Sequence, residues 1–152
     1  MGVSTGTKLN VNFIIIIAIY TYGKVSFPDT LICEYEDMEV YRGVSYTKEK
    51  MQIDKSDFIS KMELKVNNPM IAVFEEEISS YSCSCYLDIG QMRINGKFPR
   101  KKMAIAKGII KKEFGPIDIN NDTKHVDLYL FEGIDPSAEF EVIEKWEKSG
   151  LN

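Results

Sequence analysis

Histidine is the scarcest reactive residue in this sequence of 152 residues, because it occurs once, as His125. A catalytic serine or cysteine that needs a histidine base would have to use that residue. The count excludes phosphoesterases with two catalytic histidines. Glycine-rich phosphate-binding loops, dinucleotide-binding glycine patterns and calcium-loop spacings are also absent. The sequence therefore predicts no cofactor and favours binding or inhibition over catalysis.

Cysteine is scarce as well, with Cys33, Cys83 and Cys85 as an odd set of three. Two of them are only two residues apart, so we expect no disulfide framework. That spacing does not suit zinc, and no second cysteine pair exists, so we predict no metal site. Buried thiols in a reducing compartment are the simplest interpretation, and we expect a cytoplasmic protein.

No hydrophobic run is long enough for a membrane helix, which needs ~20 residues. The longest run, residues 13–20, has eight apolar residues and includes four consecutive isoleucines. Its β-branched character favours a strand buried on both faces. Its length also suits the apolar part of a secretory signal, so residues 1–23 leave secretion open as an alternative.

The sequence has no low-complexity tract, and its apolar fraction of 44% and charged fraction of 28% are typical of a folded domain. We therefore expect a single domain over residues 1–152. The 23 acidic and 19 basic residues give a net charge of -4. This balance argues against a surface that is built mainly to hold phosphates.

Period-two alternation and turn residues predict several strands. Asn95-Gly96 predicts a tight hairpin turn, and Arg42-Gly43 predicts another turn. A short helix capped by Asp54 or Ser56 is expected to end near Asn67. The predicted strands cover residues 31–41, 44–53, 70–74, 81–87 and 125–131.

Helical spacing predicts two helices in the C-terminal half of the chain. The first covers residues 99–114, where apolar residues recur at helical spacing between a proline and a Gly-Pro stop. The second begins at residues 135–137, with Phe140, Ile143 and Trp146 on one stripe. The predicted fold is α+β, a mostly antiparallel sheet with these two helices packed on it.

Acidic residues cluster in the predicted strand 31–41, and they are the preferred candidate site. Strand geometry would place at least one pair of carboxylates toward solvent or a partner. Such a surface suits a cationic site on another protein, which it would block by occlusion. We therefore predict a small inhibitory module, similar in general character to toxin-immunity or anti-defence proteins, whose contact residues are Glu34, Tyr35, Glu36, Asp37 and Glu39.

The predicted helix 99–114 carries the strongest positive charge in the chain and supports an alternative function. Its exposed face would bind nucleic acid, mainly through phosphate contacts. Solvated surface charge is the other interpretation of the same residues. The residues that would make the contacts are Lys101, Lys102, Lys107 and Lys111.

Two enzymatic alternatives remain. The first is a metal-dependent nuclease that uses Asp54, Asp57, Glu63 and Lys65. The second is a phosphate-processing enzyme that uses His125 together with the basic helix. A cysteine nucleophile at Cys83 or Cys85 is disfavoured, because their alternation with serines indicates core packing.

Overall fold

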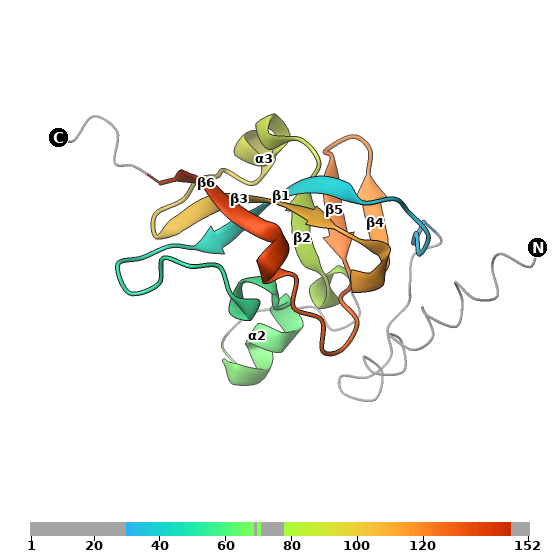
Figure 1. The fold of residues 1–152 in the computed structure, drawn as a ribbon, viewed down its shortest axis with the longest axis horizontal. Helices are drawn as coiled ribbons and strands as arrows, with labels where there is room; N and C mark the ends of the chain where they lie inside the picture. Colours follow the sequence, from blue (N-terminus) through green and yellow to red (C-terminus); the bar gives the residue numbers. More distant parts are fainter. Residues whose placement is uncertain (1–29, 69, 71–77, 147–152) are drawn as a thin grey trace, which may run out of the picture.

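The computed structural model describes residues 30–68, 70 and 78–146, and a six-stranded sheet forms its centre (Figure 1). The strands lie in the order β4-β5-β2-β1-β3-β6, and each neighbouring pair is antiparallel. Their bounds are β1 Met38–Ser45, β2 Cys83–Tyr86, β3 Met103–Ile110, β4 Ile117–Asn120, β5 His125–Leu128 and β6 Phe140–Lys145.

Helices are short in the described part of the chain. The two α-helices are α2 (Lys61–Asn67) and α3 (Ile89–Asn95), and Figure 1 shows them well apart from each other. The 3₁₀ helices are η1 (Lys55–Phe58), η2 (Ile78–Tyr81), η3 (Lys112–Phe114) and η4 (Ser137–Glu139). The predicted α+β class with an antiparallel sheet is confirmed.

One face of the sheet forms the core, because alternate residues along each strand point to the same side. The two cysteines of β2 lie in this core, as expected from their alternation with serines, and Cys33 is also buried. The buried core residues are Val40, Val44, Phe58, Cys83, Cys85, Ala104, Ala106, Ile110, Ile117, Val126, Leu128 and Phe140.

The opposite face is mostly polar, but it is covered near the middle of β1 and β3. Ile105 points to this side and is fully buried. The ring of Phe98 lies directly over Gly43, where a Cβ atom would come within 2.2 Å of a ring carbon. Gly43 is therefore a strand glycine that lets an aromatic side chain approach the backbone closely.

Strands β1 and β2 share a single registered pair, Tyr41 with Tyr86. Beside this pair the guanidinium of Arg42 donates to the backbone carbonyl of Ser84, and its Nε donates to the carbonyl of Asp57 at 2.7 Å. The same guanidinium lies 5.4 Å from the centre of the Phe58 ring. Arg42 thus links the two strands where their backbone pairing is short.

Both predicted C-terminal-half helices are wrong. Residues 99–114 contain β3 and η3, and the segment after residue 135 contains η4 and β6, up to the last described residue, Trp146. The predicted helix 99–114 fails because Gly108 disfavours a helix and because both faces of β3 carry apolar residues, which hides its period-two alternation.

The two predicted turns are also wrong. Arg42-Gly43 lies within β1, and the chain from residue 31 becomes a strand only at Met38. Gly96 is the residue after α3, and its N–H donates to the carbonyl of Met92 at 2.9 Å. Asn95-Gly96 therefore ends a helix instead of turning a hairpin.

Other local predictions are confirmed. Strands β2 and β5 lie within the predicted segments 81–87 and 125–131. Asp54 caps η1 by accepting from the N–H of Ser56, and α2 ends at Asn67, but the single helix predicted between them is divided into η1 and α2 by residues 59–60. The predicted strands at 13–20 and, apart from Met70, at 70–74 lie outside the described residues.

Candidate functional site

The acidic residues singled out in the sequence lie at the start of β1 and just before it. Glu34, Glu36 and Asp37 are exposed in the irregular segment that leads into β1, and Glu39 is exposed on β1 itself. Because β1 is antiparallel to β3, with Met38 opposite Ile110, these acids lie beside the end of β3. The pairing brings them close to Lys107 and Lys111 of the alternative nucleic-acid site.

Tyr35, in the middle of the acidic segment, is turned toward the core. The one proton of its hydroxyl is shared between the carbonyl of Lys111, at 2.8 Å, and the carbonyl of Gly115, at 2.6 Å. Burial raises the pKa of Tyr35, and the nearby Glu113 adds to this effect. The side chain therefore anchors the acidic segment to the chain that follows β3.

Three lysines at the end of β3 are each matched by one carboxylate. Lys107 lies 3.4 Å from Glu39, Lys111 lies 3.1 Å from Glu139, and Lys112 lies 3.1 Å from Glu34. The hydrogen bonds that Lys111 and Lys112 donate to Glu139 and Glu34, respectively, raise the pKa values of the two lysines.

Four further carboxylates in the same region form no ion pair with a described residue. They are exposed, and all belong to the segments that meet at the ends of β1, β3 and β6: Glu36, Asp37, Glu113 and Glu141. We call the whole set the acidic surface. It comprises Glu34, Glu36, Asp37, Glu39, Glu113, Glu139 and Glu141, together with Lys107, Lys111 and Lys112.

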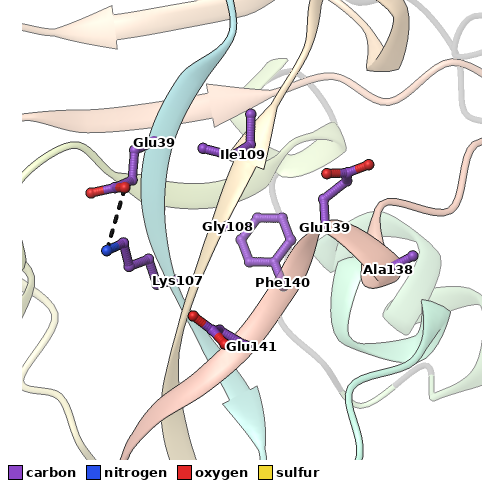
Figure 2. Close-up of a pocket in the computed structure, with 8 residues that line it drawn as sticks. All are labelled: Glu39, Lys107, Gly108, Ile109, Ala138, Glu139, Phe140 and Glu141. Carbon is purple, nitrogen blue, oxygen red and sulfur yellow. Dashed lines mark ion pairs between the residues drawn. The ribbon is translucent and has the colours of Figure 1, made fainter.

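A shallow groove of about 330 Å³ lies within the acidic surface, where the start of β6 meets β3 (Figure 2). Glu39, Glu139 and Glu141 lie around it, and Lys107 is its only lining cation. Figure 2 shows the ring of Phe140 beside Gly108 at its centre. The groove therefore offers an apolar floor with an excess of negative charge, which suits a cationic side chain.

The other two lysines of the alternative nucleic-acid site lie elsewhere. Lys101 and Lys102 are exposed in the turn before β3, at the opposite end of that strand from Lys111. The structure thus separates the four lysines that the predicted helix would have gathered on one face, and two of them are paired with glutamates.

The carboxylates of the nuclease alternative serve as local caps. Asp57 is buried and accepts from the backbone N–H groups of Ser45 and Asp54 and from Lys50 Nζ, at 2.9, 3.0 and 2.6 Å. Asp54 and Asp57 form a capping box at η1. These contacts account for both side chains without a metal ion.

Glu63 makes a second capping arrangement, at the start of α2. Its Oε2 accepts from the N–H of Ser60 at 2.6 Å, while Ser60 Oγ accepts from the N–H of Glu63 at 3.1 Å. Lys65 lies within α2. Over the described ranges, no group of three histidine, cysteine or acidic side chains is arranged to hold a metal ion.

His125 lies on the face of β5 that points away from the core. Its Nδ1 is 3.8 Å from Asp127 Oδ2, and Asp127 also accepts from Ser82 Oγ at 2.6 Å. Cys83 and Cys85 are buried on the opposite side of the sheet, so neither faces His125. The serine contacts the carboxylate instead of the imidazole, which does not match a nucleophile paired with a histidine base.

The sequence interpretation missed Glu113, Glu139 and Glu141. The signal for the last two was present, because Glu139 and Glu141 alternate with Phe140 and Val142 at a strand period. Because the segment was interpreted as a helix, Glu139 and Glu141 were not expected to lie on a strand beside the other acids.

Comparison with known proteins finds no matching family model, no matching curated protein and no matching solved structure. In the part of the chain that the structure describes, no helix has the length and apolar character needed to cross a membrane.

Proposed function

We propose that the chain is a protein-binding module that neutralises a macromolecular partner by covering a cationic site, in the manner of an immunity or anti-defence protein. One observation supports this function above the others. The lysines of the acidic surface are fully matched by Glu34, Glu39 and Glu139, and the remaining carboxylates have no ion pair among the described residues. This excess of negative charge is available to a partner.

The mechanism is electrostatic steering followed by occlusion. Exposed charges of one sign raise the association rate with a partner of the opposite sign and lower it for other partners. On contact, cationic side chains of the partner pair with Glu36 and Asp37 and enter the groove beside Glu141. A partner whose own site binds nucleic acid, such as a nuclease toxin, would present the required charge.

The alternative functions have less support. Nucleic-acid binding would need Lys107 and Lys111 to leave their glutamate partners. A metal-dependent nuclease would need Glu63 to give up its capping contact with Ser60. We place the protein in the cytoplasm, because buried thiols at Cys33, Cys83 and Cys85 suit a reducing compartment.

The test is affinity capture from the native host at low salt, with the wild-type chain and two charge-reversal variants. Glu36→Lys/Asp37→Lys changes the acidic surface. Glu49→Lys/Asp122→Lys makes the same net charge change at exposed positions in other loops. We expect one protein to elute from the wild type and from the control as salt is raised, and to be lost with the first variant.

Two results would overturn the proposed function. One is a captured protein that the Glu36→Lys/Asp37→Lys variant still holds, since the acidic surface would then be irrelevant to binding. The other is recovery of nucleic acid in place of protein, with binding lost after Lys101→Glu and Lys107→Glu substitutions.

A further inference from the structure

One row of side chains crosses the whole sheet on the face that points away from the core. The register pairs Asn120 with His125, His125 with Tyr86, Tyr86 with Tyr41, Tyr41 with Lys107, and Lys107 with Glu141. Every strand contributes one residue. We call these residues the cross-sheet row: Asn120, His125, Tyr86, Tyr41, Lys107 and Glu141.

The centre of the cross-sheet row is aromatic. Tyr41 and Tyr86 lie opposite each other and are half-buried, and the rings of Tyr86 and His125 meet edge to face with centroids 5.1 Å apart. Val40 and Cys85, which directly precede the two tyrosines, belong to the core on the other side of the sheet. The rings are therefore directed outward.

Carboxylates surround this aromatic centre. The hydroxyl of Tyr41 lies 3.4 Å from Glu39 Oε1, and Asp127 is two residues from His125 on the same face of β5. Two cations on this side of the sheet are already engaged: Lys107 pairs with Glu39, and Arg100, whose charge acts on Tyr86, stacks 4.3 Å from the centre of the Phe98 ring.

Three other aromatic rings of the chain lie under cations. Arg42 lies over Phe58, Arg100 lies over Phe98, and Lys145 lies over Tyr46. Cations bind ring faces because the ring quadrupole attracts positive charge, and neighbouring carboxylates add to this attraction.

We propose, as an extension of the proposed function and resting on it, that the partner docks an arginine side chain on Tyr41 and Tyr86. A planar guanidinium stacks on an aromatic ring and also donates to a carboxylate in bidentate fashion, whereas an ammonium does not. Glu39 lies next to Tyr41 and would supply that carboxylate by exchanging Lys107 for the incoming guanidinium. Single-stranded nucleic acid also stacks on exposed aromatics, but the carboxylates of this face oppose its phosphates.

The experiment compares three probes at low salt: an octa-arginine peptide, an octa-lysine peptide and a short oligothymidine. Affinities are measured by titration calorimetry, and the contact site is mapped from NMR shifts of the wild-type chain. We expect octa-arginine to bind about two- to fivefold more tightly than octa-lysine. The largest shifts are expected at Tyr41 and Tyr86.

Variants test the rings directly. Tyr41→Thr combined with Tyr86→Thr keeps residues that favour strands and should remove the preference for arginine. Tyr41→Phe should retain it, because the ring remains. Tyr46→Thr is the matched control, since that ring lies under Lys145.

The results separate failure of this inference from failure of the proposed function. If Glu36→Lys/Asp37→Lys weakens peptide binding but the tyrosine variants do not, the docking of arginine on the rings is wrong and the acidic surface stands. If neither the acidic-surface variant nor the tyrosine variants change peptide binding, both the inference and the proposed function are wrong. Tighter binding of oligothymidine, with shifts at Tyr41 and Tyr86, would make the row a nucleic-acid platform and overturn the inference.

Discussion

Asp118 and Asp127 lie directly opposite each other on the antiparallel pair β4–β5, so two carboxylates occupy neighbouring positions on one face of the sheet. Burial raises the pKa of Asp127, and the charge of Asp118 adds to this effect, while the hydrogen bond from Ser82 and the nearby His125 act against it. The folded chain therefore holds a proton on Asp127 more tightly than the unfolded chain does.

The raised pKa of Asp127 makes stability depend on pH. Its contribution is fully present below the unfolded pKa of about 3.9 and is lost as the pH rises through the folded pKa. Asp127→Asn removes the charge but keeps an oxygen that can accept from Ser82. We expect this variant to raise the free energy of unfolding by about 0.5–1 kcal/mol at pH 7 and to give little gain near pH 4.

Urea unfolding of the wild type and the variant at the two pH values checks this prediction. Asp122→Asn is the control, because Asp122 is exposed in the turn between β4 and β5. A variant that is less stable than the wild type at pH 7 would show that the charge of Asp127 stabilises the fold.

Asp57 is expected to be one of the most sensitive polar residues of the chain. Its side chain is 1% exposed and accepts from two backbone N–H groups and from Lys50. Asp57→Ala leaves the N–H groups of Ser45 and Asp54 without this acceptor. Because both residues are exposed, water replaces part of the lost contact, and we expect a loss of about 1–3 kcal/mol in total.

Thermal unfolding measures this cost, and Asp54→Asn provides the comparison. Asn is as good a helix cap as Asp, so that variant should remain within a few tenths of a kcal/mol of the wild type. Equal losses for Asp54→Asn and Asp57→Ala would contradict the role of Asp57 as the buried acceptor of the loop.

The sequence predicted the class of fold but exchanged the type of two elements, and β3 shows why. Met103, Ala106 and Ile110 match helical spacing, yet Ala104, Ala106 and Ile110 are buried core residues of a strand. Ile105 is buried on the other side. The outer face of β3 carries Met103, Ile105 and Ile109, with Lys107 as its polar residue, so the sequence shows little of the period-two alternation.

The error at β6 has a different cause. Ala106 is opposite Val142 and Ile105 is opposite Glu144, so Ile143 is an extra residue in β6. This bulge interrupts the period-two alternation. In the sequence, Phe140 and Ile143 are therefore apolar residues at a spacing of three, which is also the spacing of a helix.

The candidate site was partly predictable from the sequence. Clustered acids were recognised because they are adjacent in the chain. Their ion pairs with Lys107 and Lys112 depend on residues 68 and 78 positions away from their partners, and only the β1–β3 pairing brings them together. A local pattern carries no information about that pairing.

Gly108 and Phe140 lie opposite each other on β3 and β6, and a Cβ atom at Gly108 would come within 2.3 Å of the Phe140 ring. That ring cannot easily retreat, because its centroid is 4.9 Å from that of Phe58. Gly108→Ala should therefore cost about 1–3 kcal/mol. The same substitution at Gly90 in α3 should cost less, since a Cβ atom there would lie 3.0 Å from one oxygen of Asp88, a longer and milder contact.

A double-mutant cycle decides whether contact with the ring is the cause. In a Phe140→Leu background the added methyl group of Gly108→Ala meets a smaller and more adaptable side chain, so its cost in urea unfolding should fall by more than about 0.5 kcal/mol. An equal cost in both backgrounds would mean that the strain arises elsewhere. Gly108 and Phe140 also line the groove. An equal cost would therefore mean that the contact between the ring and the glycine does not set the shape of the groove.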